Sequence, residues 1–430
     1  MPGAGTIYDV AIVGAGSAGI AAAKTARALG LETVLLEASH RIGGRGYTET
    51  LGPGIAFDLG CHWMHSASRN PYVAIADRYG FVYRKGTYPR GLWIDGRWGT
   101  DADRASYEAS WDKHYAAANE AARQGRDIAV ADATDREGPW TGLFDYWTSI
   151  ATAVDPDQVS VMDSFHYDDT EENWPLRDGF GALIGRFGAD QQAVLNAAVE
   201  RIDWGGPEVR LHTKKGTIRA RRALVTVSTG VLGAGDIRFD PALPAAKLAA
   251  IEGLPLGTHN RIGLAFDRDC FGSDAPKGVA MISEGEETIA FGIRPFDQNY
   301  AVAYTGGRFA LWLERAGVAA AVDLARERLG KMFGSDVPKH VTRHIVTAWH
   351  GDPWIRGSYS AALPGQGHQR AELARPLEDR LFFGGEATSI DSHATAHGAY
   401  KSGIRAAREV AASLGRALPA SLDIAVASVA

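Results

Sequence analysis

The sequence predicts an α/β fold that opens with a Rossmann-like dinucleotide-binding domain. Two segments near opposite ends of the 430-residue chain carry this prediction, "YDVAIVGAGSAGIAAAKTARALGLETVLLEA" at 8–38 and "RLFFGGEATSIDSHATAHGAYKSGIRAAREV" at 380–410. Each joins an apolar, strand-like run to a helix-like stretch through a glycine-containing turn. With 45% hydrophobic and 22% charged residues, the composition is that of a packed globular protein long enough for two or three domains.

The N-terminal segment is predicted to form one βαβ unit. Residues 8–14 are a β-branched apolar run, which is typical of a buried strand. Residues 17–30 place helix formers at helical spacing and end in Gly30, a favoured residue at a helix end. Residues 32–38 form the second strand of the unit.

The turn of this unit carries the spacing Gly14-x-Gly16-x-x-Gly19. The first glycine permits a tight turn, the second lets the backbone approach a pyrophosphate, and the third lets helix and strand pack closely. The helix that begins at Ser17 offers free N–H groups to phosphates, and Glu37 can accept hydrogen bonds from ribose hydroxyls. These features predict a dinucleotide site in preference to a merely structural turn, but they do not distinguish NAD from FAD.

Two further glycine-containing stretches follow the βαβ unit. In "SHRIGGR" the glycine pair that ends at Gly44 lets the chain turn sharply, and Arg45 can supply charge to phosphates. A surface turn with solvated arginines is the alternative interpretation of that stretch. In "FDLGCHWMH" at 57–65, Gly60 predicts another close backbone approach and is followed by a wide aromatic residue, Trp63.

The C-terminal segment repeats the arrangement of the N-terminal one. The strand-like "LFF" runs into Gly385 and Glu386, and the loop that follows enters a helix near Thr395 and Ala396. The N-terminus of that helix offers N–H groups to a phosphate or to a ring carbonyl. The two ends of the chain are therefore expected to build one cofactor site.

Composition excludes several classes of protein. The formal net charge of −6 and the pI of about 6.1 argue against a nucleic-acid-binding protein. Only two cysteines occur, Cys61 and Cys270, so neither a disulfide framework nor a Cys-x-x-Cys redox pair is present. The sequence shows no signal-peptide pattern and no run of 18 apolar residues, so we expect a cytoplasmic protein without a membrane span.

Seven motifs in order give the sequence a resemblance to a known family. They are "VGAGSAGI…LEASHRIGGR", "DLGCHWMH", "NWPLRDGFGALI", "LVTVSTGVL", "DPWIRGSYS", "GGEAT" and "ATAHGAYKSG". The sequence resembles the flavin-containing amine oxidases, the broad family of monoamine and polyamine oxidases, and "HATAHGAY" is more similar to the polyamine oxidases. The resemblance implies FAD as cofactor and a small-molecule amine as substrate. The expected reaction oxidises the C–N bond to an imine, then aldehyde plus ammonia or a smaller amine, with O2 as acceptor giving H2O2.

The resemblance also implies an interleaved domain organisation. A Rossmann-like FAD-binding domain would take residues 1–75, 190–265 and 375–430, and an α+β substrate-binding domain would take 76–189 and 266–374.

Two elements inside these pieces are predicted from the residues themselves. Residues 191–228 are expected to form a short β-meander around the Lys-Lys-Gly turn that begins at Lys214. Residues 319–334 are expected to be helical and to lie in the substrate-binding domain.

The same resemblance assigns residues to the cofactor. Val199 would meet the adenine side, and His62 and Trp63 would line the flavin ring. Ser358 stands where relatives with covalent flavin carry a cysteine, so the FAD is expected to be non-covalent. The residues expected to contact FAD are Gly14, Gly16, Ser17, Gly19, Glu37, Ala38, Gly44, Arg45, Gly60, His62, Trp63, Val199, Gly385, Glu386, Thr395 and Ala396.

The motifs place four residues on the substrate side. Tyr359 would form one aromatic wall of the path to the flavin, and Trp354 lies in the same motif. The second wall falls on Thr395, which is not aromatic, so a symmetrical aromatic cage is not expected. His65 falls where polyamine-type relatives present a polar or acidic group to the substrate. Core packing is the alternative for the aromatic residues, and a structural role is the alternative for His65.

Arg261 marks a departure from the family pattern. In the family a lysine usually bonds a water that bridges to flavin N5, and in "PLGTHNRIGLAFD" that position falls on Arg261. Arginine keeps the positive charge but is longer, planar and hard to deprotonate. We expect it to reach the N5 side, whereas an alignment slip would bring His259 or Asn260 there instead.

Other clusters admit weaker interpretations. His-x-x-His at 62 and 65 and His-x-x-x-His at 393 and 397 invite a metal site, but no third ligand is arranged with them, so no metal is expected. The acidic stretch 165–179 is either a funnel for a cationic amine or a solvated loop, and the second is favoured.

Three functions remain in competition. The first is an FAD amine oxidase, or an amine dehydrogenase that uses another acceptor. The second is an FAD-dependent desaturase or protoporphyrinogen-type oxidase that acts on C–C bonds, and Tyr359 with "ATAHGAY" favours the first over it. The third is a non-catalytic carrier such as a Rab GDP-dissociation inhibitor, against which the intact glycine motif, Glu37 and Arg45 argue. The sequence leaves the amine and the oligomeric state open.

Overall fold

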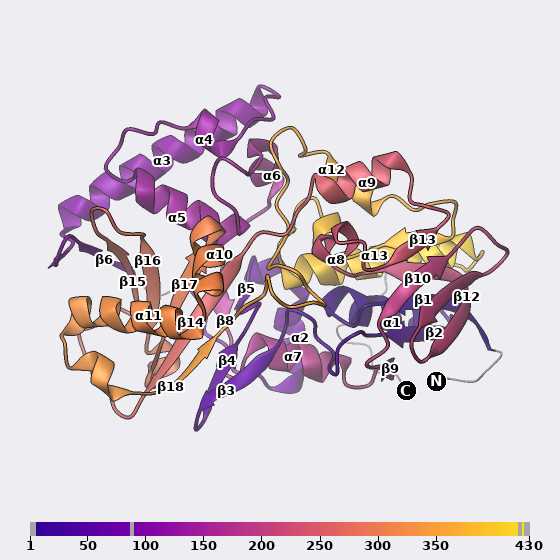
Figure 1. Ribbon diagram of the computed structural model, residues 1–430, viewed down its shortest axis with the longest axis horizontal. Helices are drawn as coiled ribbons and strands as arrows, with labels where there is room; N and C mark the ends of the chain where they lie inside the picture. The colour runs from indigo at the N-terminus through magenta and orange to yellow at the C-terminus, as the bar shows by residue number, and fades with distance from the viewer. Residues whose placement is uncertain (1–5, 87–89, 420–423, 425–430) are drawn as a thin grey trace.

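The computed structural model describes residues 6–86, 90–419 and 424, so the outermost residues of the predicted pieces 1–75 and 375–430 lie outside it. Within this part of the chain, two large β-sheets stand at opposite ends of the long axis of the molecule (Figure 1). One is mainly built from the two ends and the middle of the chain. The other is built from segments between them.

The first sheet has eight strands and contains the predicted βαβ unit. β1 and β2 pair in parallel on either side of the turn that leads into α1, as the glycine pattern predicts. The sheet runs in the order β13-β10-β11-β12-β1-β2-β9, with β19 also paired to β12. The strands and the helix are β1 (Ile7–Val13), α1 (Ser17–Ala28), β2 (Thr33–Leu36), β9 (Ala193–Val194), β10 (Val199–Asp203), β11 (Val209–Thr213), β12 (Gly216–Val225), β13 (Arg238–Asp240) and β19 (Leu381–Phe383).

Helices cover both faces of this sheet. The residues of β1 alternate between two cores: Val10 and Ile12 pack with alanines of α1 and α13, and Ala11 and Val13 pack with α9 and α12. The predicted meander is confirmed as β10, β11 and β12, with its turn at Lys214. The helices are α8 (Thr229–Gly233), α9 (Ala245–Glu252), α12 (Gln369–Ala374) and α13 (Ala396–Ser413).

Parallel pairing brings four strand ends to one edge of the first sheet. β1 pairs in parallel with β2 and β12, and β12 pairs in parallel with β19. The carboxyl ends of these strands therefore lead to Gly14, Glu37, Thr226 and Gly384 at the same edge. Ligands of open α/β sheets bind at such an edge.

The second sheet has seven strands and is mostly antiparallel. Its order is β18-β14-β17-β16-β15-β6-β7, and only the pair of β6 with β15 is parallel. The strands are β6 (Arg90–Ile94), β7 (Arg97–Trp98), β14 (His259–Phe266), β15 (Gly278–Ile282), β16 (Ile289–Ile293), β17 (Tyr300–Gly306) and β18 (Val341–Val346).

The two faces of the second sheet differ. Even-numbered residues of β14, such as Ile262 and Leu264, pack in one core with α10 (Gly307–Ala316) and α11 (Val318–Phe333). The predicted helix at 319–334 is thereby confirmed. On the other face, Leu92 of β6 packs with α5 (Thr141–Thr152). Odd-numbered residues of β14 lie on the face away from α10 and α11, where Ala265 packs with Leu51 and Phe57.

The remaining elements complete the layers between and beside the sheets. They are β3 (Thr48–Gly52), β4 (Ile55–Asp58), β5 (Trp63–Met64), α2 (Pro71–Tyr79), α3 (Asp101–Arg123), α4 (Val130–Ala133), α6 (Val161–His166), β8 (Trp174–Pro175) and α7 (Phe180–Gly188), with short 3-10 turns at Ala67–Arg69, Pro295–Asp297, Val337–His340 and Glu386–Thr388. No helix in the described ranges is both long and apolar enough to cross a membrane.

The sheets suggest one adjustment to the expected domain limits. The predicted limit at residue 265 would cut through β14, which pairs with β17 and β18 of the second sheet. We propose that the FAD-binding domain ends before His259, because a strand and its hydrogen-bonded partners belong to one unit.

Candidate active site

A cavity of about 1330 Å³ is lined by residues of both sheets. At one end lie the turns that follow β1 and β2, and at the other lie side chains of β14, β16 and β17. All predicted cofactor and substrate-side residues except Gly19 line it: Gly14, Gly16, Ser17, Glu37, Ala38, Gly44, Arg45, Gly60, His62, Trp63, His65, Val199, Arg261, Trp354, Tyr359, Gly385, Glu386, Thr395 and Ala396.

Glycine backbone lines the cavity beside the N-terminus of α1. Gly16 precedes α1, and no side chain caps the N–H groups of the first turn. Gly14 and Gly385 have φ angles of 100° and 119°, which glycine adopts readily. Gly19 lies outside the cavity and has the expected packing role, since a Cβ there would stand 1.8 Å from Gly14 O. A helix N-terminus beside bare backbone suits a pyrophosphate.

Glu37 stands at the end of β2 and is held by two backbone donors. Its Oε2 accepts from Ala15 N at 2.7 Å and its Oε1 accepts from Ser39 N at 2.9 Å. Burial raises the pKa of the Glu37 carboxyl, although these N–H groups act in the opposite direction. The carboxylate is thus fixed in orientation where it lines the cavity.

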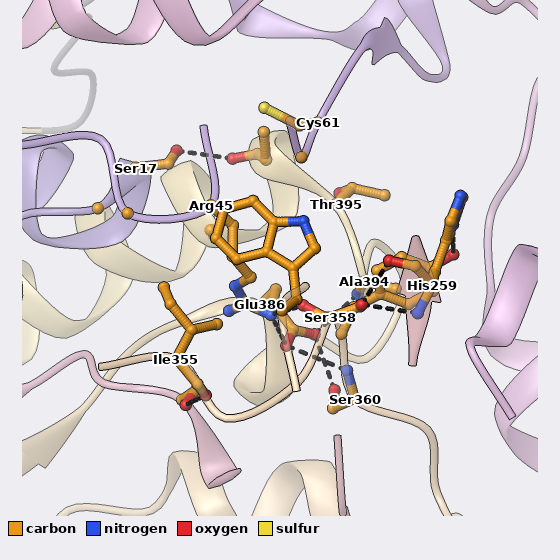
Figure 2. A pocket seen from close by; sticks show the side chains of 18 of the residues that line it. Ser17, Arg45, Cys61, His259, Ile355, Ser358, Ser360, Glu386, Ala394 and Thr395 are labelled. Carbon is orange, nitrogen blue, oxygen red and sulfur yellow. Dashed lines mark hydrogen bonds and ion pairs between the residues drawn. The ribbon is translucent and has the colours of Figure 1, made fainter. Parts of the chain in front are cut away.

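Arg45 lies within a buried network rather than free in the cavity. Its Nη1 donates to Ser358 O at 2.6 Å and to Glu386 Oε1 at 3.0 Å (Figure 2). Glu386 Oε2 in turn accepts from Ser360 Oγ at 2.7 Å and from Ala394 N at 2.9 Å. The motifs containing these five residues therefore meet at one point, which the sequence could not show.

The Tyr359 ring lines the cavity, and its hydroxyl makes two hydrogen bonds within the chain. The hydroxyl donates to Ile150 O and accepts from His259 Nδ1 at 2.8 Å. Burial raises the pKa of Tyr359, so the phenol stays neutral. Burial and the charge of Arg261 lower the pKa of His259 to about 3, so its imidazole is neutral as well.

Arg261 points into the cavity from β14. Its side chain is buried, its Nη1 donates to Asp58 O at 3.0 Å, and its guanidinium carbon lies 5.7 Å from the centre of the Tyr304 ring. No carboxylate pairs with it among the residues that the structure describes. The arginine is thus a fixed cation at the wall.

Alternation along β14 decides which residues face the cavity. His259 and Arg261 both line it, whereas Asn260 faces α10 and donates to Glu314 Oε2 at 2.6 Å. Asn260 is therefore excluded as the cavity-facing residue. The period-two pattern of "THNRIGLAF" could have predicted that His259 and Arg261 share a face.

The other substrate-side candidates differ in their surroundings. Thr395 caps α13, since its Oγ1 accepts from Gly398 N at 2.9 Å and donates to Ser392 O at 2.7 Å. Trp354 lines the cavity but is 48% exposed. His65 Nδ1 donates to Asn173 Oδ1 at 2.5 Å, and burial lowers the pKa of this histidine.

Acidic and aromatic side chains line another part of the cavity. Glu108 and Asp112 of α3 lie there with Trp111 and Tyr115, which alternate with them on the helix. Of the five acidic residues in the stretch 165–179, only Asp169 lines the cavity. The others, Asp168, Glu171, Glu172 and Asp178, do not. The acidic residues that line this part of the cavity thus come mainly from α3, which the sequence did not indicate.

Metal ligands do not gather in the described part of the chain. No group of three or more His, Cys, Asp or Glu side chains there could hold a metal ion.

Comparison with known proteins identifies the family. A family model described as flavin containing amine oxidoreductase matches residues 17–411. The chain belongs to this family. Its membership makes the protein an FAD-dependent amine oxidoreductase.

Individual members of the flavin-containing amine oxidoreductases are similar over most of the chain. Polyamine oxidase 4 of Oryza sativa subsp. japonica is 28% identical over 93% of this chain and 88% of that protein. Lysine-specific histone demethylase 1 homolog 1 of the same plant is 30% identical over 94% of this chain but only 52% of that protein. The chain thus spans about half the length of that demethylase.

A solved structure shows the same fold. It is a putrescine oxidase redesigned in its cofactor binding, and it aligns with a TM-score of 0.79 at 17% identity over 94% of this chain and 99% of that one. The predicted fold class, a Rossmann-like domain interleaved with an α+β domain, is confirmed by this likeness and by the two sheets.

Proposed function

We propose that this amine oxidoreductase binds FAD non-covalently and oxidises the C–N bond of a small cationic amine to an imine. One observation carries the proposal: a single cavity joins the bare-backbone turns at Gly14 and Gly16 to a chamber walled by Tyr304, Tyr359 and Arg261. The imine would then hydrolyse to an aldehyde and ammonia or a smaller amine. The names polyamine oxidase and putrescine oxidase, which two similar proteins bear, agree with an amine substrate.

The residues around the proposed FAD site suit that cofactor. Gly16 and the first turn of α1 would hold the pyrophosphate, Glu37 the ribose, and Val199 the adenine side. A bound FAD would act as the two-electron oxidant. The residues of the chain would orient the substrate, exclude water and provide charge.

Ser358 argues for a non-covalent cofactor. Its hydroxyl accepts from His259 N at 2.7 Å and donates to His259 O at 2.8 Å (Figure 2), so both of its hydrogen-bonding roles are used within the chain. Acid precipitation of the holoenzyme should leave all flavin in the supernatant. Flavin in the pellet would contradict this part of the proposal.

Acidic residues and aromatic rings that line the cavity would favour an amine as the substrate. Glu108, Asp112 and Asp169 would draw a cationic amine towards the cavity. Deeper in, the rings of Tyr304 and Tyr359 would exclude water, and the buried Arg261 would disfavour a second positive charge. The amine would thus be attracted as a cation and react as a neutral molecule, whose lone pair can form the C=N bond.

An anaerobic substrate screen tests the function. Diamines, polyamines, aromatic monoamines and amino acids would be mixed with the holoenzyme without oxygen, and loss of the yellow flavin absorbance would be recorded. At least one amine should bleach the flavin, and compounds that can lose hydrogen only across a C–C bond should not. Bleaching by the latter alone would favour the desaturase-type alternative.

Oxygen as the acceptor is a separate part of the proposal. Because the family resemblance places Arg261 where relatives carry a lysine, an amine dehydrogenase with another acceptor is the second candidate. A fixed cation stabilises negative charge that develops beside it. Arg261→Met should therefore slow reoxidation of the reduced enzyme by O2, and Arg261→Lys should retain it, in stopped-flow measurements against oxygen concentration. Equal reoxidation constants for all three proteins would remove Arg261 from this role.

A further inference from the structure

Asp58 is a buried residue at the end of β4, and its carboxylate accepts hydrogen bonds from β3 and from α7. Its Oδ1 accepts from Thr48 Oγ1 at 2.5 Å and from Gly181 N at 3.0 Å, and its Oδ2 accepts from Phe180 N at 2.9 Å. It thereby binds the first turn of α7, where a negative charge is favoured. Burial opposes this charge, but hydrogen bonds led by that from His62 hold the pKa of Asp58 below its usual value.

The same carboxylate orients His62. The Nδ1 of His62 lies 3.2 Å from Asp58 Oδ2, and because an ionised carboxylate only accepts, Nδ1 carries the proton of the neutral ring. The other nitrogen, Nε2, is then an unprotonated acceptor. It has no hydrogen-bond partner within the described residues, and the ring lines the cavity.

A second neutral histidine at the cavity offers a useful contrast. His259 also lacks a partner at Nε2, but that atom is completely covered by protein atoms. The Nε2 of His62 is not among the covered atoms, and its side chain keeps 12% of its surface exposed. Of these two histidines, His62 is therefore the one whose free lone pair a ligand can reach.

On these grounds we propose that His62 is the base that removes a proton from the bound substrate ammonium, with Asp58 as its positioning residue. The proposal rests on the amine oxidation proposed above. A histidine that a carboxylate orients through one nitrogen commonly acts as a base through the other.

The charged and titratable groups that face His62 support this role. Burial lowers the pKa of His62, the hydrogen bond to Asp58 raises it, and Arg261 of β14 lowers it, so the net shift is downward and the ring is neutral. His65 from the same loop is also neutral because burial lowers its pKa, and Tyr304 of β17 is a neutral phenol because burial raises its pKa. An incoming ammonium would meet Arg261 as a like charge and His62 as an acceptor.

The proton balance of this step is simple. One N–H bond of the ammonium breaks, its electron pair stays on the amine nitrogen, and an Nε2–H bond forms on His62. The neutral amine then loses the α-hydrogen with its electron pair to the bound oxidant as the C=N bond forms. The imidazolium is stabilised by the ionised Asp58 until its proton passes to solvent.

The pH profile of single-turnover reduction is the first test. His62→Gln keeps an amide donor that can reach Asp58 but has no basic nitrogen. Its anaerobic reduction rate at pH 7 should fall about 100-fold, within the range seen for loss of a general base. The rate should recover at high pH, where the amine loses its own proton near about pH 10.4. A Thr48→Val control removes another hydrogen bond from the same carboxylate and should keep the wild-type profile shape.

A spectroscopic readout tests the contact between His62 Nε2 and a bound ammonium without turnover. Holoenzyme containing ¹⁵N-labelled histidine would be saturated with tert-butylamine, which has no α-hydrogen and is not oxidised. The His62 signals, identified by their absence in His62→Gln, should keep the neutral Nδ1–H form, and the Nε2 signal should shift upfield because Nε2 accepts a hydrogen bond from the bound ammonium. An Nε2 signal that does not change when the amine binds, or a His62→Gln profile that matches wild type, would overturn the proposal. If no amine bleaches the wild-type flavin, the proposed function fails by itself, while this spectrum still reports on His62.

Discussion

At the scale of single residues, Tyr359 shows how a wall of the cavity is fixed. Its hydroxyl is engaged with Ile150 O and His259 Nδ1, both of which belong to the chain rather than to a ligand. The hydroxyl therefore holds the ring in place, and the ring itself faces the cavity. Removing the hydroxyl and removing the ring should have different consequences.

Tyr359→Ala should slow anaerobic flavin reduction by about tenfold, or about 1.4 kcal/mol of barrier, because it opens the dry path to the cofactor. Tyr359→Phe should keep most of the rate but lose about 1–3 kcal/mol of stability, because buried groups of Ile150 and His259 lose their partner. Stopped-flow reduction and thermal denaturation measure the two effects, with flavin content as the control. Equal reduction rates for all three proteins would show that the ring is only a packing residue.

At the scale of elements, α1 and α13 bring their N-terminal turns to the same end of the cavity. Ser17 Oγ donates to Ala396 O at 2.7 Å, which joins the two first turns. Farther along, a Cβ added at Gly403 would lie 2.1 Å from Ala18 O, so the two backbones are in direct contact there. This contact sets the separation of the two N-termini.

Gly403→Ala should therefore destabilise the protein and lower its FAD content. The clash with α1 is expected to cost about 1–3 kcal/mol, which exceeds the gain of about 1 kcal/mol that alanine brings over glycine within a helix. Gly185→Ala in α7 is the matched control, because a Cβ there meets nothing within 4 Å. Melting temperature and flavin-to-protein ratio are the measurements. Similar values for the two variants would mean that α1 and α13 can separate without loss.

At the scale of the whole molecule, a buried ion pair joins parts that carry different sheets. Asp163 of α6 accepts from Arg370 of α12 through Oδ1 at 2.5 Å and Oδ2 at 2.7 Å, and their side chains are only 4% and 2% exposed. Arg370 continues to Ser360, which bonds to Glu386 at the cavity. The network thus connects α6, which packs in one core with α3 and α5, with the segment that follows β19 of the first sheet.

Asp163→Asn should cost about 3–5 kcal/mol, because it leaves the Arg370 guanidinium buried without an anion. Burial opposes ionisation of Asp163, but the charges of Arg370 and His393 hold its pKa below the usual value. A depressed folded-state pKa means that this stabilisation is present above the unfolded pKa of about 3.9 and is lost as the pH falls below it.

Melting temperatures between pH 7 and pH 3 check this prediction. The gap between wild type and Asp163→Asn should be widest near pH 7 and should narrow at the acidic end. Asp157→Asn is the control, since its pair with Arg308 is exposed and worth at most about 1 kcal/mol. A loss no larger than that of the control would show that the buried pair does not hold the two parts together.

The elements that sequence reasoning predicted are those whose signals are local. The turn from Gly14 to Gly19, the meander around Lys214 and the helix after residue 318 each have a glycine spacing or a periodicity that lies within one short stretch. Such patterns can be recognised without knowing the fold. A tight turn requires glycine at set positions, and an element with one buried face shows a regular spacing of apolar residues. Arg261 was expected at the cofactor from the family resemblance, and it lines the cavity, but its role beside the flavin stays a prediction.

Only the tertiary structure decided which distant side chains meet. His62 and Asp58 are close in sequence, yet their pairing gains its role only because α7 binds the Asp58 carboxylate, Arg261 binds the Asp58 backbone carbonyl, and Nε2 of His62 is left free at the cavity. Likewise, nothing local links Asp163 to Arg370, or Glu108 of α3 to Asp169. The sequence by itself determined that the chain has a dinucleotide-binding βαβ unit, and which residues form its strands. The protonation states, the walls and the charges facing the substrate depend on burial and on partners far along the chain, and these exist only after folding.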